Sequence, residues 1–359
     1  MHVIVVGAGI IGALTAYRLA RAGVAVTVIE ANQPASAASG ASFGWINASF
    51  YLDEDHFALR AAAMDAHRRL AAELKTTATV WQGCLCWEEQ GDALDAQHAA
   101  LKDLGYDVRE IDRDAFASLE PEIAPPGRAL CFEQEGAVDL SRLCHDALNA
   151  ATSMGARIVA GVAVTGIEVR AGRVAGIRWS GGVIPADHVV LATGVKTQEL
   201  LAGVDVALPM LDRPGLILRT EPLAPMLSHI LVAPGQELRQ DNTGRLLAPV
   251  AASHKSDAAE KIDENPVVFA DEAARRVGQL IGREVQWEQV TLSHRPVPVD
   301  GRPVVGSAGP DGLYVSTMHS GATLAPLVSE IAAQEILGTP LSNQNAARVS
   351  PYRPERFNQ

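Results

Sequence analysis

The first thirty residues alternate between two hydrophobic periods. Residues 3–6 form an unbroken apolar run, which is typical of a strand buried on both faces of a parallel sheet. Apolar residues at helical spacing then continue to Gly23, and a second apolar run over residues 24–29 ends at Glu30. This order predicts a strand, a tight turn, a helix and a second strand, which together form a βαβ unit.

The turn between the first strand and its helix is rich in glycine, and reads Gly7-Ala8-Gly9-Ile10-Ile11-Gly12. The glycine spacing and the acidic Glu30 match the dinucleotide-binding fingerprint. Gly7 permits the tight turn, Gly9 lets backbone approach a pyrophosphate, and Gly12 lets the helix pack closely on the sheet. The N–H groups of Ile10 and Ile11 lie at the start of the helix, where phosphate is favoured, and Glu30 can accept hydrogen bonds from ribose. A ligand-free glycine turn is the alternative, but the complete strand and helix context favours a bound cofactor.

A loop of small residues follows Glu30. It begins at Ala31 and contains Ser39-Gly40-Ala41-Ser42, where a nicotinamide-binding domain usually continues with a regular helix. A flexible linker is one interpretation. Its position directly after the ribose-binding acid favours a loop that lies along an extended cofactor.

The next hundred residues mix helices and short strands. A helix is predicted over residues 56–74, with its polar residues His56, Arg60 and His67 on a solvated face. Cys84 and Cys86 lie on one face of a predicted strand and are expected to be reduced core thiols, because two cysteines without a second pair make a poor zinc site. A helix is expected over residues 94–104, an irregular connector over 106–126, and a helix over 140–154 that ends at Gly155.

The cofactor domain resumes in the second half of the chain. Strands are predicted over residues 156–159, 162–170, 173–179 and 184–192, and the last of them leads into the small-residue turn Ala192-Thr193-Gly194. Residues 208–299 alternate as short strands with one helix near 271–280, which indicates a mostly antiparallel sheet. A final helix is expected over 324–337, followed by a polar tail from Thr339 that frays.

The expected fold class is therefore α/β, with a discontinuous Rossmann-like cofactor domain and an inserted α+β substrate domain. Residues 1–80, 137–204 and 296–359 are assigned to the cofactor domain, and residues 81–136 and 205–295 to the substrate domain.

Composition limits the possible partners. The chain has 359 residues and a formal net charge of -12, which disfavours nucleic acid and anionic membrane surfaces and requires a local cation for any anionic substrate. Four cysteines are too few for a disulfide scaffold. The sequence shows no metal-ligand pattern, targeting segment or membrane span, so we expect a cytoplasmic protein.

Four segments, taken in order, resemble one family. They are the glycine turn with Glu30, residues 39–42, residues 191–194, and the stretch from Arg295-Pro296 to His319-Ser320-Gly321-Ala322-Thr323. Together they resemble the FAD-dependent D-amino-acid oxidase superfamily, nearest its glycine oxidase, sarcosine oxidase and D-amino-acid dehydrogenase branch. The resemblance implies FAD as the dinucleotide, held in addition by Val164, by residues 192–194 and by residues 320–323. Some relatives attach FAD to a late cysteine, but this chain has none after Cys144, so non-covalent FAD is expected.

The resemblance also implies the chemistry. Arg295 is expected to bind the substrate carboxylate through its planar fork, and His319 stands where glycine-oxidase relatives often have an arginine. The predicted reaction is hydride transfer from the Cα of an amino acid to flavin N5, giving an imine that hydrolyses, with dioxygen or another acceptor reoxidising the flavin. Oxidation of a 2-hydroxy acid with His319 as base, a flavoprotein subunit of an electron-transfer complex, and a nicotinamide dehydrogenase are the alternatives.

Three questions stay open from sequence. Tyr51, Arg239 and His254 are pocket candidates without a position, the identity of the amino acid is unresolved, and a homo-oligomer is neither required nor excluded.

Overall fold

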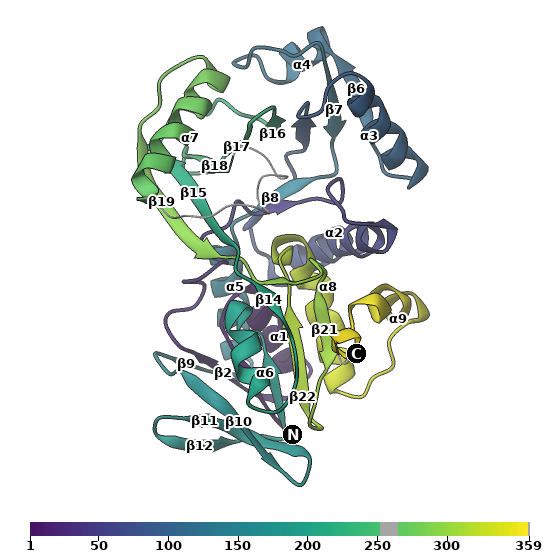
Figure 1. Cartoon of the computed structure of the whole chain (residues 1–359), viewed down its shortest axis with the longest axis vertical. Coiled ribbons are helices and arrows are strands. Elements are labelled where there is room, and N and C mark those ends of the chain that lie inside the picture. The colour runs from purple at the N-terminus through teal and green to yellow at the C-terminus, as the bar shows by residue number, and fades with distance from the viewer. Residues whose placement is uncertain (252–264, 358–359) are drawn as a thin grey trace.

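We analysed a computed structural model, which describes residues 1–251 and 265–357. The ribbon has two lobes, with both termini on the lower one (Figure 1). The lower lobe is built on a six-stranded sheet in the order β21-β22-β13-β1-β2-β9. Its strands are β1 (His2–Val6), β2 (Ala25–Glu30), β9 (Arg157–Ala160), β13 (His188–Leu191), β21 (Val304–Ser307) and β22 (Leu313–Thr317). All are parallel except β21, which runs antiparallel to β22.

Three helices pack together beside this sheet. α1 contacts both α5 and α8, and the strands they cover supply the fully buried side chains of Val3, Val5 and Val28. Their bounds are α1 (Ile10–Arg21), α5 (Leu140–Ser153) and α8 (Gly321–Ile336). A small antiparallel sheet of β10 (Val164–Arg170), β11 (Arg173–Trp179) and β12 (Gly182–Pro185) contacts β13 through β11. Ile4 and Ile29 join the core on that side, so both faces of the parallel sheet are covered, as its apolar strands require.

The upper lobe is an eight-stranded sheet in the order β19-β15-β18-β17-β16-β5-β7-β6. All its pairs are antiparallel except β16 with β5. Its strands are β5 (Cys84–Cys86), β6 (Arg109–Asp112), β7 (Arg128–Phe132), β15 (Pro214–Thr220), β16 (Ile230–Ala233), β17 (Gln236–Gln240), β18 (Leu246–Pro249) and β19 (Trp287–His294). Helices α3 (Asp92–Asp103), α4 (Arg113–Leu119) and α7 (Pro266–Ile281) accompany it. The predicted class, a Rossmann-like domain with a mostly antiparallel second sheet, is confirmed; the domain boundaries stay a prediction.

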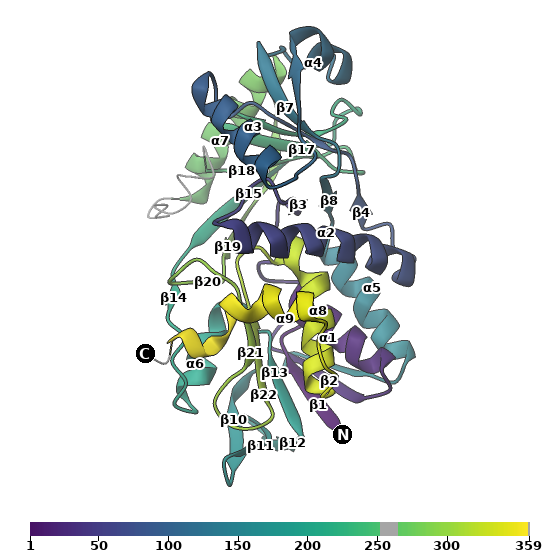
Figure 2. The same ribbon diagram turned by 90° about the vertical axis from the view of Figure 1, so that its right-hand side faces the viewer.

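Short elements join the lobes. β3 (Trp45–Ile46), β8 (Gly136–Val138) and β4 (Thr79–Val80) form a three-stranded sheet, and β14 (Met210–Leu211) pairs with β20 (Val297–Pro298). α6 (Thr197–Ala202) follows β13. The long helix α2 (Glu54–Leu74) crosses between the two lobes (Figure 2).

The polar residues of α2 are not on a solvated face, contrary to the sequence expectation. His56, Arg60 and His67 are buried, at 5%, 5% and 1% relative exposure. They are covered because α2 packs against α8, α5 and α9 (Asn343–Val349). α2 has an exposed face, which includes Asp65 and Arg69, but His56, Arg60 and His67 lie on the opposite, packed face.

Three further local expectations are wrong. The connector over residues 106–126 contains β6 and α4, with Phe116 buried. The strand expected over residues 184–192 is two strands in different sheets, β12 and β13, since Asp187 between them donates its N–H to the His2 carbonyl. The tail does not fray in its described part: it forms α9, and Tyr352 is fully buried.

Candidate functional site

The glycine turn brings three backbone segments into close contact. Gly7 has φ +102°, and a Cβ there would lie 2.4 Å from the Ala192 carbonyl oxygen, so neither the conformation nor the space admits a side chain. A Cβ on Gly12 would lie 1.9 Å from the Gly7 carbonyl oxygen. The end of β1, the start of α1 and the turn after β13 are therefore packed backbone to backbone.

Glu30 lies at the carboxyl end of β2, beside this turn. Its Oε2 accepts from the Ala8 N–H at 2.8 Å and its Oε1 from the Asn32 N–H at 2.9 Å. These bonds hold the carboxylate in one orientation, and each oxygen keeps a second lone pair for a ribose hydroxyl. Ala31 beside it is exposed.

The small-residue loop returns to the start of α1. Ser39 Oγ accepts from the Ile10 N–H at 2.9 Å, and a Cβ on Gly40 would lie 2.2 Å from the Ala35 carbonyl oxygen. The loop expected along the cofactor therefore lies directly over the helix N-terminus that would face a pyrophosphate.

The remaining predicted cofactor residues lie on neighbouring segments. Thr193 and Gly194 follow β13, and the Thr193 hydroxyl lies 3.0 Å from that of Thr197. Gly321 starts α8 beside the start of α1, since a Cβ on it would lie 3.6 Å from Ile10 Cγ2. Val164 begins β10 and is partly buried against the core on the opposite face of the sheet.

These residues fit a dinucleotide. Two glycines leave no room for a Cβ, the α1 N-terminus offers N–H groups near the loop, and a fixed carboxylate lies at the end of β2. The four cysteines are free and buried, and none lies in the wall of the large cavity described next, so the described residues offer no thiol for covalent attachment there.

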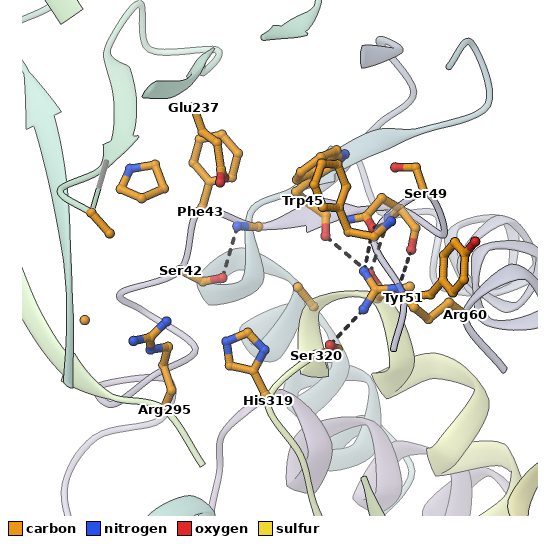
Figure 3. Close-up of a pocket in the computed structure, with 18 of the residues that line it drawn as sticks. Ser42, Phe43, Trp45, Ser49, Tyr51, Arg60, Glu237, Arg295, His319 and Ser320 are labelled. Carbon is orange, nitrogen blue, oxygen red and sulfur yellow. Dashed lines mark hydrogen bonds between the residues drawn. The ribbon is translucent and has the colours of Figure 1, made fainter. Parts of the chain in front are cut away.

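A cavity of about 850 Å³ opens between the two lobes. Its wall includes Ser42 to Trp45 from the loop, Ser320, Ala322 and Thr323 at the start of α8, and Gly215 to Ile217 of β15. Arg295 and His319 both lie in this wall, and Figure 3 shows their side chains pointing into the cavity, with Glu237 entering from the opposite side. The predicted catalytic pair and the predicted flavin-side segments therefore share this one space.

Arg295 is half-buried. Its Nη2 donates to the Pro214 carbonyl at 2.8 Å, which fixes the guanidinium against β15. Burial, with a smaller contribution from the charge of Arg213, lowers the pKa of Arg295 to about 10. The side chain is therefore still cationic at neutral pH, and it supplies the local positive charge that an anionic substrate needs in an acidic chain.

Arg60 supports the floor of the cavity from α2. Its Nε donates to the Asn47 carbonyl at 3.0 Å, its Nη2 to Asn47 Oδ1 at 2.6 Å, and its Nη1 to Ser320 Oγ at 2.8 Å (Figure 3). Burial lowers the pKa of Arg60 to about 10. One guanidinium thus joins the segment after β3 to the residue that precedes α8.

A buried carboxylate supports the same segment. Glu135 accepts from Trp45 Nε1 at 2.9 Å, from the Tyr106 hydroxyl at 2.7 Å and from the Ser49 N–H at 3.2 Å. Burial raises the pKa of Glu135 to about 7. These bonds fix the ring of Trp45, which lies in the cavity wall.

His56 also lines the cavity. Its Nδ1 accepts from the Leu52 N–H at 3.1 Å, which leaves the proton of the neutral ring on Nε2, and Nε2 has no partner in the described part of the chain. Burial, then the charges of Arg60, His319 and Arg302, lowers the pKa of His56 to about 3. The ring is neutral at pH 7 and acts as a hydrogen-bond donor rather than a base.

Sequence reasoning missed Arg60, His56 and Glu135. A signal for two of them is present: His56, Arg60, Ala63 and His67 follow the i, i+4, i+7, i+11 spacing of one helix stripe, and that stripe also holds the buried Leu70. Of the three unplaced candidates, Tyr51 lines the cavity, Arg239 lies behind the Phe43 carbonyl, and His254 lies outside the described residues.

The described residues hold neither a metal-binding cluster nor a membrane-spanning helix. No group of three or more His, Cys, Asp or Glu side chains is placed to hold a metal within residues 1–251 and 265–357. No helix in that part of the chain is long and apolar enough to cross a bilayer.

Comparison with known proteins gives matches over nearly the whole chain. Glycine oxidase of Pseudomonas aeruginosa is 27% identical, covering 98% of each chain, and D-amino acid dehydrogenase of Cereibacter sphaeroides is 24% identical, covering 89% of this chain and 87% of its own. Among solved structures, glycine oxidase from Geobacillus kaustophilus has a TM-score of 0.86 at 23% identity, covering 99% of this chain and 98% of its own, which shows a shared fold. The DAO family, described as FAD dependent oxidoreductase, matches residues 2–335. Because this match spans most of the chain, the protein belongs to the DAO family of FAD-dependent oxidoreductases.

Proposed function

We propose that this protein oxidises the C–N bond of a small amino acid, namely a D-amino acid, glycine or an N-alkylated amino acid. The observation that carries the proposal is the shared cavity, in which Arg295 and His319 face the loop of Ser42 to Trp45 and the start of α8. Relatives named glycine oxidase and D-amino acid dehydrogenase support the same reaction class.

The family's cofactor supplies the chemistry of this reaction, because FAD accepts a hydride when bound. We assign the glycine turn and Glu30 to the adenosine and pyrophosphate end, and residues 39–42 with Thr193 to the middle. Residues 320–323 lie at the cavity end, where the α8 N-terminus stabilises negative charge. The free cysteines outside the cavity wall support a non-covalently held cofactor.

Arg295 orients the substrate in this proposal. Its fork binds the carboxylate, and the bond from Nη2 to the Pro214 carbonyl limits the positions that the fork can take. The Cα–H bond breaks and its electron pair leaves as a hydride, while the nitrogen lone pair forms the C=N bond. The nitrogen must be neutral for this step, so it releases one proton to solvent, and the imine is then hydrolysed by water.

Glu237 is 6% exposed and lies in the cavity wall, where its carboxylate can accept a hydrogen bond from the N–H of a neutral amine. The need for a base distinguishes an amine-bearing substrate from a 2-hydroxy acid, because only the hydroxy acid needs one for its hydroxyl proton. Of the two histidines in the cavity wall, His56 is unsuited to that role with a pKa of about 3, which leaves His319. In the His319→Gln variant, loss of turnover with FAD retained would therefore favour the hydroxy-acid reaction.

A substrate screen tests the proposal. The purified FAD-loaded protein is mixed under anaerobic conditions with glycine, sarcosine, proline, a panel of D-amino acids and matching 2-hydroxy acids, and flavin absorbance is followed. We expect at least one amino acid to bleach the flavin. Air is then admitted: formation of hydrogen peroxide identifies dioxygen as the electron acceptor, and no peroxide indicates another acceptor. Bleaching only by hydroxy acids, or by nothing in the panel, would overturn the proposal, and the second result would favour a subunit of a larger complex.

A further inference from the structure

A second cavity lies on the other side of the Ser42–Gly44 segment from the first. It has a volume of about 760 Å³ and is enclosed by strands β15, β17 and β18 of the upper lobe and by β8 and the start of α5 of the lower lobe. Ser39, Gly40 and Ser42 contribute to its wall. The described residues of the wall do not include Glu30, any residue of the glycine turn or any residue of α8. Apart from these loop residues, the second cavity therefore shares no described residue with the segments assigned to the cofactor.

Two arginines, from the strands on either side of β18, line this second cavity. Arg219 on β15 and Arg239 on β17 both line it, and β18 lies between their strands. Burial lowers the pKa of Arg239 to about 10, the charges of Asp241 and Asp139 oppose this shift, and the charge of Arg219 adds to it, so the two guanidinium groups are within electrostatic reach of each other. Like charges repel, and an anion bound between two arginines of one wall would relieve this repulsion.

The acidic residues of this wall are hydrogen-bonded or ion-paired to groups other than Arg219 and Arg239. Asp139 caps α5 by accepting from the Arg142 N–H, Asp241 accepts from the N–H groups of Thr243 and Arg245 in its own turn, and Glu288 is paired with Arg245. The Arg219 side chain has no hydrogen-bond or ion-pair partner among the described residues. The wall as a whole carries four arginines against three carboxylates, and so a small excess of positive charge.

Arg239 makes this a built site rather than a surface patch. It is 7% exposed, and its Nε donates to the Phe43 carbonyl at 2.5 Å, which fixes the side chain against the loop. The other guanidinium nitrogens have no bond to a described residue and remain available to the cavity. A buried guanidinium held by one nitrogen and open at the others matches the fork geometry that binds a carboxylate or a phosphate.

We propose that this second cavity is an anion-binding site, in which Arg219 and Arg239 together bind a multiply charged oxyanion such as a phosphate ester or a polycarboxylate. The volume exceeds that of a single phosphate, so a small organic molecule is the expected ligand class. Phe43 lines the first cavity, and its carbonyl accepts a hydrogen bond from Arg239. A ligand bound to Arg239 is therefore connected, through this bond, to the segment that separates the two sites.

Calorimetric titration of the FAD-loaded protein tests the site, with inorganic phosphate and citrate as separate probes at constant ionic strength. We expect saturable 1:1 binding of at least one probe, and the stronger probe indicates the phosphate or carboxylate source. Arg219→Gln should weaken binding about tenfold or more, the scale of a lost charge-assisted hydrogen bond. Arg219 is partly buried and makes no side-chain hydrogen bond or ion pair with a described residue, so this change spares the fold.

Two controls keep the outcome decisive. Arg109→Gln makes the same charge change at an exposed ion pair with Glu133 outside both cavities, and it should leave binding unchanged. Arg239→Lys keeps the charge but loses the fork, and it should weaken binding while FAD content stays the same. Absence of saturable binding, equal affinity in Arg219→Gln, or binding seen only after FAD removal would overturn the proposal, because the last result would place the anion in the cofactor site.

Discussion

Arg295 and Arg60 show how surroundings decide what an arginine does beside one cavity. Burial lowers the pKa of both to about 10. Three nitrogens of Arg60 are bonded to Asn47 and Ser320, so its task is to hold the wall. Arg295 bonds backbone carbonyls of the neighbouring strand and lies in the wall half-buried, so it is suited to meet a substrate.

Arg295→Gln should lower kcat/KM for the best substrate of the screen by about 100-fold, since a charge-assisted bond to a carboxylate contributes about 1.5–3 kcal/mol. FAD content, from the ratio of flavin to protein absorbance, should not change. Arg213→Gln removes the neighbouring charge without touching the cavity wall and is the matched control. An unchanged kcat/KM in Arg295→Gln would exclude it as the carboxylate site.

His67 predicts a pH dependence of stability. Burial lowers its pKa from 6.5 to about 4. The unfolded state therefore binds more protons between these values, so the contribution of His67 is complete above pH 6.5 and is lost as pH falls towards 4. His67→Gln should flatten the curve of unfolding free energy against pH by about 3 kcal/mol over this range, measured by urea denaturation. His145→Gln, an exposed histidine, should leave the slope unaltered.

Glycine positions were predictable at this scale because backbone geometry restricts them, while the burial of His56 and Arg60 was not. The contact that excludes a side chain at Gly12 is with the Gly7 carbonyl, within the same βαβ unit, and the positive φ of Gly7 belongs to the turn itself. Arg60, in contrast, donates to Ser320 at the start of α8, which lies 260 residues away in the chain.

At the scale of elements, strong periodicity identified α1, α5 and the parallel strands. The elements that were missed are short: β6 and α4 cover only Arg109–Leu119, and α9 is seven residues long. Such elements depend on packing rather than on intrinsic propensity. Tyr352 is an example. Its complete burial next to α9 orders the tail, although the polar composition of the tail predicts fraying.

The junction of β1 and α1 gives a prediction at this scale. Gly12→Ala should lower the unfolding free energy by about 3 kcal/mol or more, because the new Cβ would meet the Gly7 carbonyl oxygen and force the helix from the sheet. FAD content should fall with it, measured on the folded fraction. Gly127→Ala is the matched control, because a Cβ there meets nothing within 4 Å. Full FAD content in Gly12→Ala would refute the assigned role of this turn.

At the scale of the whole molecule, the cavity is assembled from segments scattered along the chain. The cofactor end could be assigned from sequence because its motifs are local, and the resemblance supplied Arg295 and His319. The wall formed by β15, β17 and the segment after β5 could not be placed, because alternating short strands do not reveal their order in a sheet. Glu237 therefore emerged only with the structure, and Tyr51, a candidate without a position in the sequence, is placed in the cavity wall by it.

Arg60 tests whether this assembly acts as one unit. Arg60→Met keeps the length and apolar volume of the side chain but leaves the Asn47 and Ser320 acceptors without their buried donor. We expect the unfolding free energy to fall by about 3 kcal/mol, and KM to rise because both unsupported segments line the cavity. Arg69→Met on the same helix removes a half-exposed pair with Glu330 and should cost less than about 1 kcal/mol with KM unchanged. If Arg60→Met lowered stability but left KM at the control value, the cavity wall would be held by the Glu135 network alone, and Arg60 would be a purely structural residue.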